Sequence, residues 1–180
     1  MKTSIYRQLC AVLILLASIA AAQQATRLID WQPVVPSPNA NVRAIQVVGI
    51  TVNATHVITG EPFSANDDWL DKLTFKIRNV SDKTITVFWF HVAFPEIDLG
   101  DGGHAGLGIL YESDKSPDGR NRIAPGSEVA VTLAADKLHL LRQTSNRMIG
   151  TTHLTRLNIL PGAAFFDDGS SVSGISLRRP

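Results

Sequence analysis

Residues 73–96, LTFKIRNVSDKTITVFWFHVAFPE, join two runs rich in β-branched and aromatic residues through the polar segment NVSDK. In the first run, Leu73, Phe75 and Ile77 alternate with polar residues, which is the period-two pattern of a strand buried on one face. The asparagine, serine and aspartate of NVSDK are residues whose side chains bond the local backbone in turns. The stretch therefore predicts two antiparallel strands and the turn between them.

The second run, TITVFWFHVAF (residues 84–94), is mostly apolar on both faces. It predicts a central strand that is covered on both sides. Inward aromatic side chains dominate small sandwich cores, so Trp89 is predicted to lie in the core and His91 in or near it. Pro95 is predicted to end the strand, because proline has no N–H to donate to the ladder.

The rest of the chain carries further short patterns. VRAIQVVGITV, VAVTL and LTRLNIL predict strands, with a bulge at Gly49, and Pro161-Gly162 is predicted to break the last of them. AAFFDDGSSVSGISL predicts a closing hairpin around Asp168-Gly169. ADKLHLLRQTSN is the one helical candidate. Together these patterns predict an all-β fold, an antiparallel β-sandwich of six to eight short strands with one short helix.

Residues 1–22 have the three-part layout of a secretory signal peptide. Lys2 and Arg7 precede the apolar run LCAVLILLASIA. The run is followed by a cleavage site of small residues, the alanines at positions 20 to 22. The apolar run is shorter than the ~20 residues that span a bilayer, so a retained membrane anchor is the lesser alternative. The mature protein is expected to be secreted or periplasmic, with no membrane span after cleavage.

The chain after the signal peptide predicts one domain with a lead-in. Residues 23–41 contain three prolines within six residues and no sustained periodicity, which predicts an extended proline-rich segment. Residues 42–180 are predicted to form the β-sandwich domain. The 158 residues that remain after cleavage are enough for a core of their own. Cleavage also removes the one cysteine, so stability must come from packing.

The net charge of the mature chain limits the classes of partner that it is expected to bind. Without Lys2 and Arg7 the chain has 15 basic and 16 acidic residues, a net charge of −1. A near-neutral chain without a basic run has no electrostatic footprint for nucleic acid or anionic lipid. The expected partner is another protein or a cell-surface component.

Residues 96–122 predict a long loop rich in glycine and aspartate, and loops of this length are uncommon unless functional or mobile. Asp98, Asp101 and His104 lie close together in it. Carboxylates on a flexible loop can wrap a calcium ion, which takes six to eight oxygen ligands, although the spacing is not that of an EF-hand. The favoured interpretation is a solvated connection without a cofactor, and a metal site at these three residues is the alternative.

The sequence contains no G-x-S-x-G elbow, and the cysteine is lost with the signal peptide. Its five histidines lack the short spacings typical of zinc or copper ligands. Carboxylates from distant parts of the chain can still pair, as in glycoside hydrolases. The expected function is therefore that of a non-enzymatic binding, adhesion or structural module. The alternatives are a secreted hydrolase and a calcium- or copper-binding protein.

Three segments, NVSDKTI (79–85), PGSEVAVTL (125–133) and FFDDGSSVSG (165–174), act together with the signal peptide as a recognisable set. They resemble a class of exported bacterial proteins of uncharacterised function with an immunoglobulin-like or fibronectin-III-like sandwich. In that class, a strand ending in asparagine, a Ser/Asp/Lys turn and an aromatic strand form the central hairpin. The resemblance covers residues 42–177 in outline. It implies an immunoglobulin-like topology and no particular activity or functional residue.

Overall fold

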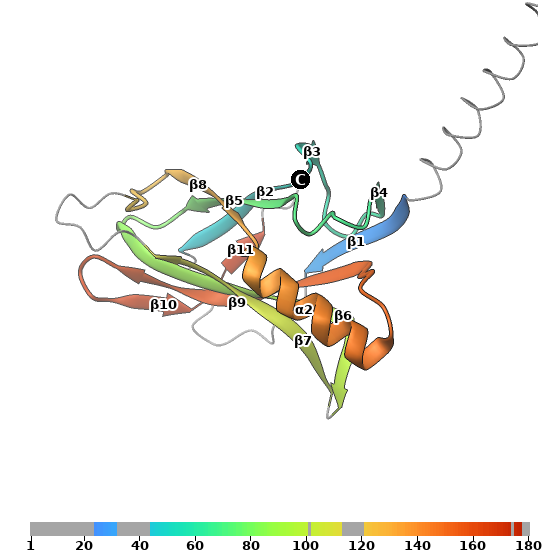
Figure 1. Ribbon diagram of the computed structural model, residues 1–180. Helices are drawn as coiled ribbons and strands as arrows, with labels where there is room; N and C mark the ends of the chain where they lie inside the picture. Colours follow the sequence, from blue (N-terminus) through green and yellow to red (C-terminus); the bar gives the residue numbers. More distant parts are fainter. Residues whose placement is uncertain (1–23, 32–43, 101, 113–120, 174, 178–180) are drawn as a thin grey trace, which may run out of the picture.

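The computed structural model describes residues 24–31, 44–100, 102–112, 121–173 and 175–177. These residues form eleven strands and one helix (Figure 1). In chain order the elements are β1 Ala25–Trp31, β2 Ile45–Val52, β3 Thr55–His56, β4 Phe63–Ala65, β5 Leu73–Asn79, β6 Ile85–Gly100, β7 Gly103–Glu112, β8 Glu128–Thr132, α2 Ala135–Ile149, β9 Arg156–Phe166, β10 Ser171–Ser173 and β11 Ile175–Leu177.

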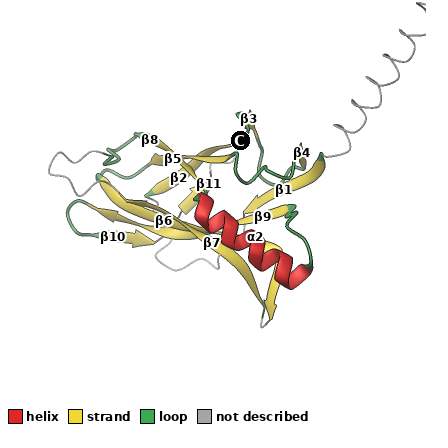
Figure 2. Cartoon of the chain, in the orientation of Figure 1, coloured by secondary structure: helices red, strands yellow, loops and turns green. Residues whose placement is uncertain are grey.

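The strands form two sheets around one hydrophobic core. One sheet has the order β4-β1-β9-β6-β7, with β10 beside β9, and the other has the order β11-β2-β5-β8, with β3 beside β2. Figure 2 shows α2 crossing the side of the two sheets, where Leu138 and Leu141 bury their side chains. The prediction of a mostly β fold with two sheets and one helix is confirmed.

The predicted antiparallel character is only partly right. β1 runs parallel to β9, and β11 runs parallel to β2, so both sheets are mixed. The prediction also gave too few strands. Part of the difference is β1, which the sequence predicted as extended lead-in and which pairs with both β9 and β4. Residues 1–23 and 32–41 lie outside the described residues.

β5 has the faces that its sequence predicts. Leu73, Phe75 and Ile77 are buried, whereas Lys76 is exposed. Phe75 meets Phe90 of the opposite sheet edge-to-face, with 5.3 Å between ring centroids. This aromatic contact joins the two sheets at the centre of the core.

The predicted hairpin between the two runs of residues 73–96 is wrong. β5 pairs with β2 and β8, whereas β6 pairs with β7 and β9 in the other sheet. The segment NVSDK connects β5 of one sheet to β6 of the other, and the side chain of Asn79 is buried in this connection. Its Nδ2 donates to the carbonyl oxygens of Lys83 and Ile123, and its Oδ1 accepts from Ser81. These bonds stabilise a bend between sheets rather than a tight return within one sheet.

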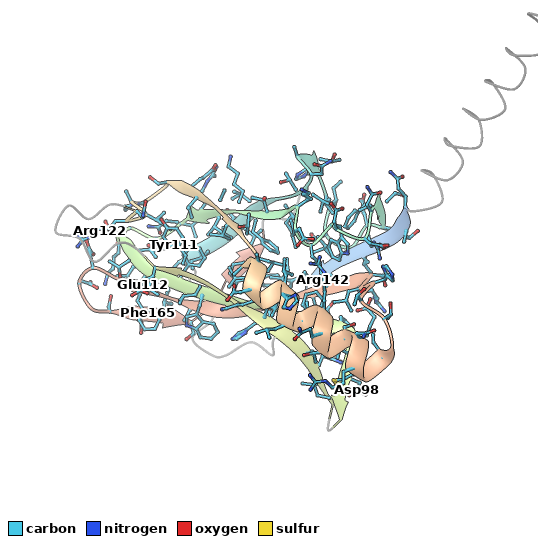
Figure 3. All side chains as sticks on the ribbon, in the orientation of Figure 1. Asp98, Tyr111, Glu112, Arg122, Arg142 and Phe165 are labelled. Atoms are coloured by element: carbon cyan, nitrogen blue, oxygen red, sulfur yellow. The ribbon has the colours of Figure 1, made fainter. Side chains whose placement is uncertain are left out.

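β6 is buried on one face only. Phe88, Phe90 and Phe94 point into the core, whereas Trp89 is half-buried on the outer face and His91 is exposed beside it. The predictions of a core Trp89 and of a near-core His91 are therefore wrong. On the outer face of β6, the apolar residues Val87 and Trp89 remain partly exposed. Phe165 of the neighbouring β9, labelled in Figure 3, pairs with Val87 and is 42% exposed.

The two prolines that were predicted to end strands lie inside them. β6 continues through Pro95 to Gly100, and the pairing is irregular between Phe94 and Asp98. β9 continues through Pro161-Gly162, and its register shifts at the same place. A proline is tolerated where a bulge already interrupts the ladder. The predicted loop 96–122 is consequently the end of β6 followed by β7, and residues 113–120 of it lie outside the described residues.

Several local predictions are confirmed. The register shift between Val47 and Gly49 is the predicted bulge in β2. α2 includes the predicted helical segment and ends at Gly150, which has a φ of 71°. β9 and β10 form the closing hairpin around Gly169, with a φ of 80°. None of the helices in the described part of the chain has the length and apolar character to cross a membrane.

Candidate functional site

The three residues of the predicted metal site lie at the tip of the β6–β7 hairpin. Asp98 and His104 are opposite each other across the ladder, and Asp101 lies outside the described residues. Asp98, labelled in Figure 3, accepts a hydrogen bond from the N–H of Gly100 at 2.8 Å. Among the described residues, no three His, Cys, Asp or Glu side chains are grouped to hold a metal ion. The metal site stays a prediction.

A cleft of about 360 Å³ lies at the corner formed by the β2–β3 hairpin, β4 and the turn 66–72. This volume is at the lower end of the range of ligand pockets in proteins. In Figure 1 the corner of β3 and β4 is remote from the tip of the β6–β7 hairpin. The residues that line the cleft are Gln24, Val52, Asn53, Thr55, His56, Val57, Phe63, Ser64, Ala65, Asn66, Asp68, Trp69 and Lys72.

The β2–β3 hairpin forms one wall of the cleft. Its two connecting residues, Asn53 and Ala54, have φ values of 50° and 64°. Positive φ at both central residues is typical of the type I′ turn, which matches the twist of a two-stranded hairpin. The tight turn allows Thr51 of β2 to pair with His56 of β3. The backbone pairing of β2 and β3 therefore holds the His56 imidazole at the cleft.

Two aromatic rings form the base of the cleft. Trp69 is only 1% exposed, and its indole Nε1 donates to the carbonyl oxygen of Leu154 at 2.8 Å. Phe63 meets the Trp69 ring edge-to-face, with 5.7 Å between centroids. The hydrogen bond to Leu154 holds the indole in one position, so the apolar base is preformed.

A buried arginine of β1 anchors the turn 66–72 through Asp67. Arg27 is 1% exposed, and it donates to the carbonyl oxygen of Leu154 at 3.0 Å and to Asp67 Oδ1 at 2.6 Å. His153 Nδ1 lies 2.8 Å from Asp67 Oδ2. Desolvation raises the pKa of Asp67, but the hydrogen bond from Arg27 and the neighbouring His153 more than offset it, so the pKa lies below its usual value.

A second ion pair ties the same turn to the helix. Arg142 of α2, labelled in Figure 3, donates to both carboxylate oxygens of Asp71, at 3.1 and 2.5 Å. A two-bond contact of this kind fixes orientation as well as position. The turn is thus held at Asp67 and at Asp71, one on each side of the cleft residue Asp68.

The polar side chains inside the cleft are free of such contacts. All eight are exposed, and none makes a hydrogen bond or ion pair with another described residue. They are Gln24, Asn53, Thr55, His56, Ser64, Asn66, Asp68 and Lys72. The charges of Asp68 and Lys72 cancel, so the cleft is close to neutral when His56 is uncharged. It offers amide, hydroxyl, carboxylate and ammonium groups over an apolar base.

A second hollow, of about 370 Å³, lies on the outer face of the β2-β5-β8 sheet. Its lining consists of Val48, Gly49, Thr51, His56, Thr74, Lys76, Glu128, Val129 and Ala130. Glu128 accepts hydrogen bonds from Lys76 and from Arg78, and these bonds lower its pKa. His56 lines this hollow as well as the corner cleft.

We expect Asp67→Asn to destabilise the protein by about 1–2 kcal/mol at pH 7, because buried Arg27 would lose its counter-ion while the 48% exposure of the Asp67 side chain lets water screen part of the interaction. The folded-state pKa of Asp67 is depressed, so its contribution is present above the unfolded pKa of about 3.9 and is lost as the pH falls through the folded pKa. Denaturant titrations should therefore show the difference from wild type shrinking below that pH. Asp68→Asn is the matched control and should leave stability unchanged at both ends of the range. An equal loss for the two variants would contradict this account.

The sequence did not predict the cleft. None of the side chains of residues 53–68, NATHVITGEPFSANDD, is singled out for binding by the sequence patterns. The usable signal was the density of asparagine, threonine, serine and aspartate between two strong strands. Comparison of the chain with models of protein families, with curated proteins and with solved structures finds no match.

Proposed function

We propose that the protein is an exported, immunoglobulin-like binding module that holds a sugar unit of a neutral carbohydrate in the corner cleft. One observation carries the proposal. Eight exposed polar side chains surround an apolar aromatic base and have no partner among the described residues. The acidic neighbours of the cleft residue Asp68, by contrast, are bound to Arg27 and Arg142.

The mixture of groups favours a ligand with hydroxyls. A hydroxyl both donates and accepts, so it can bond to the amide of Asn66, the carboxylate of Asp68 and the ammonium of Lys72 in turn. The cancelling charges of Asp68 and Lys72 favour a neutral ligand over an ion. The C–H face of a sugar ring can pack on the exposed part of Phe63, as apolar surface packs on aromatic rings elsewhere.

The anchoring of the turn 66–72 supports binding rather than mere solvation. Side chains on a fixed backbone lose less conformational freedom when a ligand binds, so more of the contact energy remains as affinity. Arg27 and Arg142 supply this anchoring from outside the cleft, and the hydrogen bond from the Trp69 indole to Leu154 supplies it at the base. A cell-surface or environmental polysaccharide is the kind of partner that an exported module would meet.

The test is calorimetric titration with neutral linear oligosaccharides: cellohexaose, mannohexaose, maltohexaose and chitohexaose. We expect one of them to bind, and we expect the double variant Asn66→Ala/Asp68→Ala to weaken that binding at least about tenfold, since each hydrogen bond to a charged group contributes about 1.5–3 kcal/mol. Asn146→Ala/Asp82→Ala removes the same two side-chain types from exposed positions elsewhere and should bind as wild type does.

Two results would contradict the proposal. One is the absence of binding by any of the four sugars, and the other is unchanged affinity in the cleft variant. Chromatography of the titrated sugar separates binding from turnover. Shorter products that accumulate with time would favour the secreted hydrolase over a binding module.

A further inference from the structure

The corner cleft and the second hollow share one lining residue, His56. Resting on the proposed function, we infer that the two hollows form one groove and that the natural ligand is a chain of several sugar units. A single sugar would fill the corner cleft alone. A chain would continue past His56 onto the outer face of the β2-β5-β8 sheet.

A row of threonines leads from His56 across that face. Thr51 of β2 pairs with His56 of β3, Thr74 of β5 pairs with Thr51, and Thr132 of β8 pairs with Thr74. Residues that are directly opposite one another in a ladder point to the same face of the sheet. The three hydroxyls and the imidazole therefore form one line of polar groups, perpendicular to the strands.

The hydroxyls of this row are open to a ligand. Thr132 is exposed, Thr51 and Thr74 are partly exposed, and none of the three side chains makes a hydrogen bond with another described residue. Neighbouring strands lie about 4.8 Å apart, so the row from β3 to β8 covers about 14 Å. This spacing is comparable to the repeat of a linear pyranose chain, so successive units can meet successive side chains.

The next row of the sheet shapes the floor and the side of the groove. Gly49 and Ala130, on either side of Lys76 in this row, leave the floor low because neither has a long side chain. Lys76 and Glu128 form an ion pair at 2.5 Å, and this pair lines the hollow. The floor of the groove therefore carries small side chains and its side carries polar ones. This combination suits an extended chain with many hydroxyls.

The experiment is calorimetric titration of the exported protein with cello-, manno-, malto- and chito-oligosaccharides of one to six units. We expect affinity for the bound series to rise with chain length up to about four units, one in the corner cleft and about three over the threonine row of about 14 Å. Thr74→Arg should block the row, reducing the affinity for the hexamer to that for the single unit and leaving the single unit unaffected. Ser171→Arg on β10 of the other sheet is the matched control and should change neither affinity.

Ala130→Arg is the second blocking variant. It lies on an exposed position of the edge strand β8, so it should fold even if Thr74→Arg does not, and it should produce the same loss for long chains. Affinity that is independent of chain length, or a hexamer that binds both blocked variants as tightly as wild type, would overturn the groove and leave the corner cleft as the site. Absence of binding at every length would overturn the proposed function itself.

Discussion

Gly162→Ala is expected to prevent the protein from folding. A Cβ atom at position 162 would lie 1.7 Å from the carbonyl oxygen of Trp89 and 2.6 Å from its carbonyl carbon. Both are backbone atoms of β6, which is hydrogen-bonded on both sides, so neither can move away without breaking the ladder between β6 and β9. Losses above about 4–5 kcal/mol come from a short list of severe defects, and a clash of this kind in the centre of a sheet is one of them.

Circular dichroism and denaturant titration measure the effect directly. We expect the variant to lack a cooperative unfolding transition. Gly108→Ala is the matched control, because a Cβ there would lie 3.6 Å from the His91 ring, which is ordinary contact. That variant should unfold within about 1 kcal/mol of wild type, as mild surface substitutions do. A Gly162→Ala protein with a wild-type midpoint would show that β9 does not approach β6 as described.

Phe75→Ala is expected to cost about 3–5 kcal/mol, as large-to-small changes in packed cores do. Phe75 is completely buried, and its ring makes the edge-to-face contact with Phe90 that joins the two sheets. Truncation would leave a cavity between the sheets, which the rigid backbones of β5 and β6 could not fill. Urea titration of the purified variant gives the change in unfolding free energy.

Trp89→Ala supplies the comparison, since the same chain segment predicts both aromatics as core. In the structure Trp89 lies half-buried on the outer face of β6, in contact with the exposed His91. Its truncation removes less buried surface and opens no internal cavity, so we expect less than half the loss measured for Phe75→Ala. Equal losses for the two variants would mean that the outer face of β6 is covered as fully as the core.

The sequence predicts the elements of this fold better than their partners, and β5 shows why. The alternation of Leu73, Phe75 and Ile77 is a local pattern, and it specifies both the strand and its buried face. The choice of β2 and β8 as neighbours, instead of β6, depends on contacts far along the chain. The same is true of the parallel pairs β1–β9 and β11–β2, which no local sequence pattern predicts.

The two prolines show a second limit on what the sequence predicts, namely where a strand ends. Pro95 and Pro161 were predicted to end strands because proline cannot donate a hydrogen bond. Both lie at register shifts, where the ladder already lacks a bond, and the strands continue beyond them. A bulge requires knowledge of the opposite strand, so a single sequence does not reveal it. The error had a large consequence, because it turned the β6–β7 hairpin into a loop.

The candidate site was harder to predict than the fold. The cleft combines the β2–β3 hairpin, β4 and the turn 66–72, and each of its polar residues is an ordinary loop residue by itself. What distinguishes Asp68 is the contrast with Asp67 and Asp71, which bind Arg27 and Arg142. Those partners are 40 and 71 residues away in the chain. Only the three-dimensional arrangement separates the anchoring acids from the free one.

The most direct test of the central claim is a map of amide chemical shifts in the isotope-labelled protein during titration with the hexasaccharides named above. We expect one sugar to shift the amides of Asn53, His56, Asp68 and Thr74 together, along the line from the corner cleft to the threonine row. The amides of Asp98 and Phe165 should stay in place. Shifts that cluster at either of those two residues, or an unchanged spectrum with every sugar, would contradict the claim that this groove is the binding site.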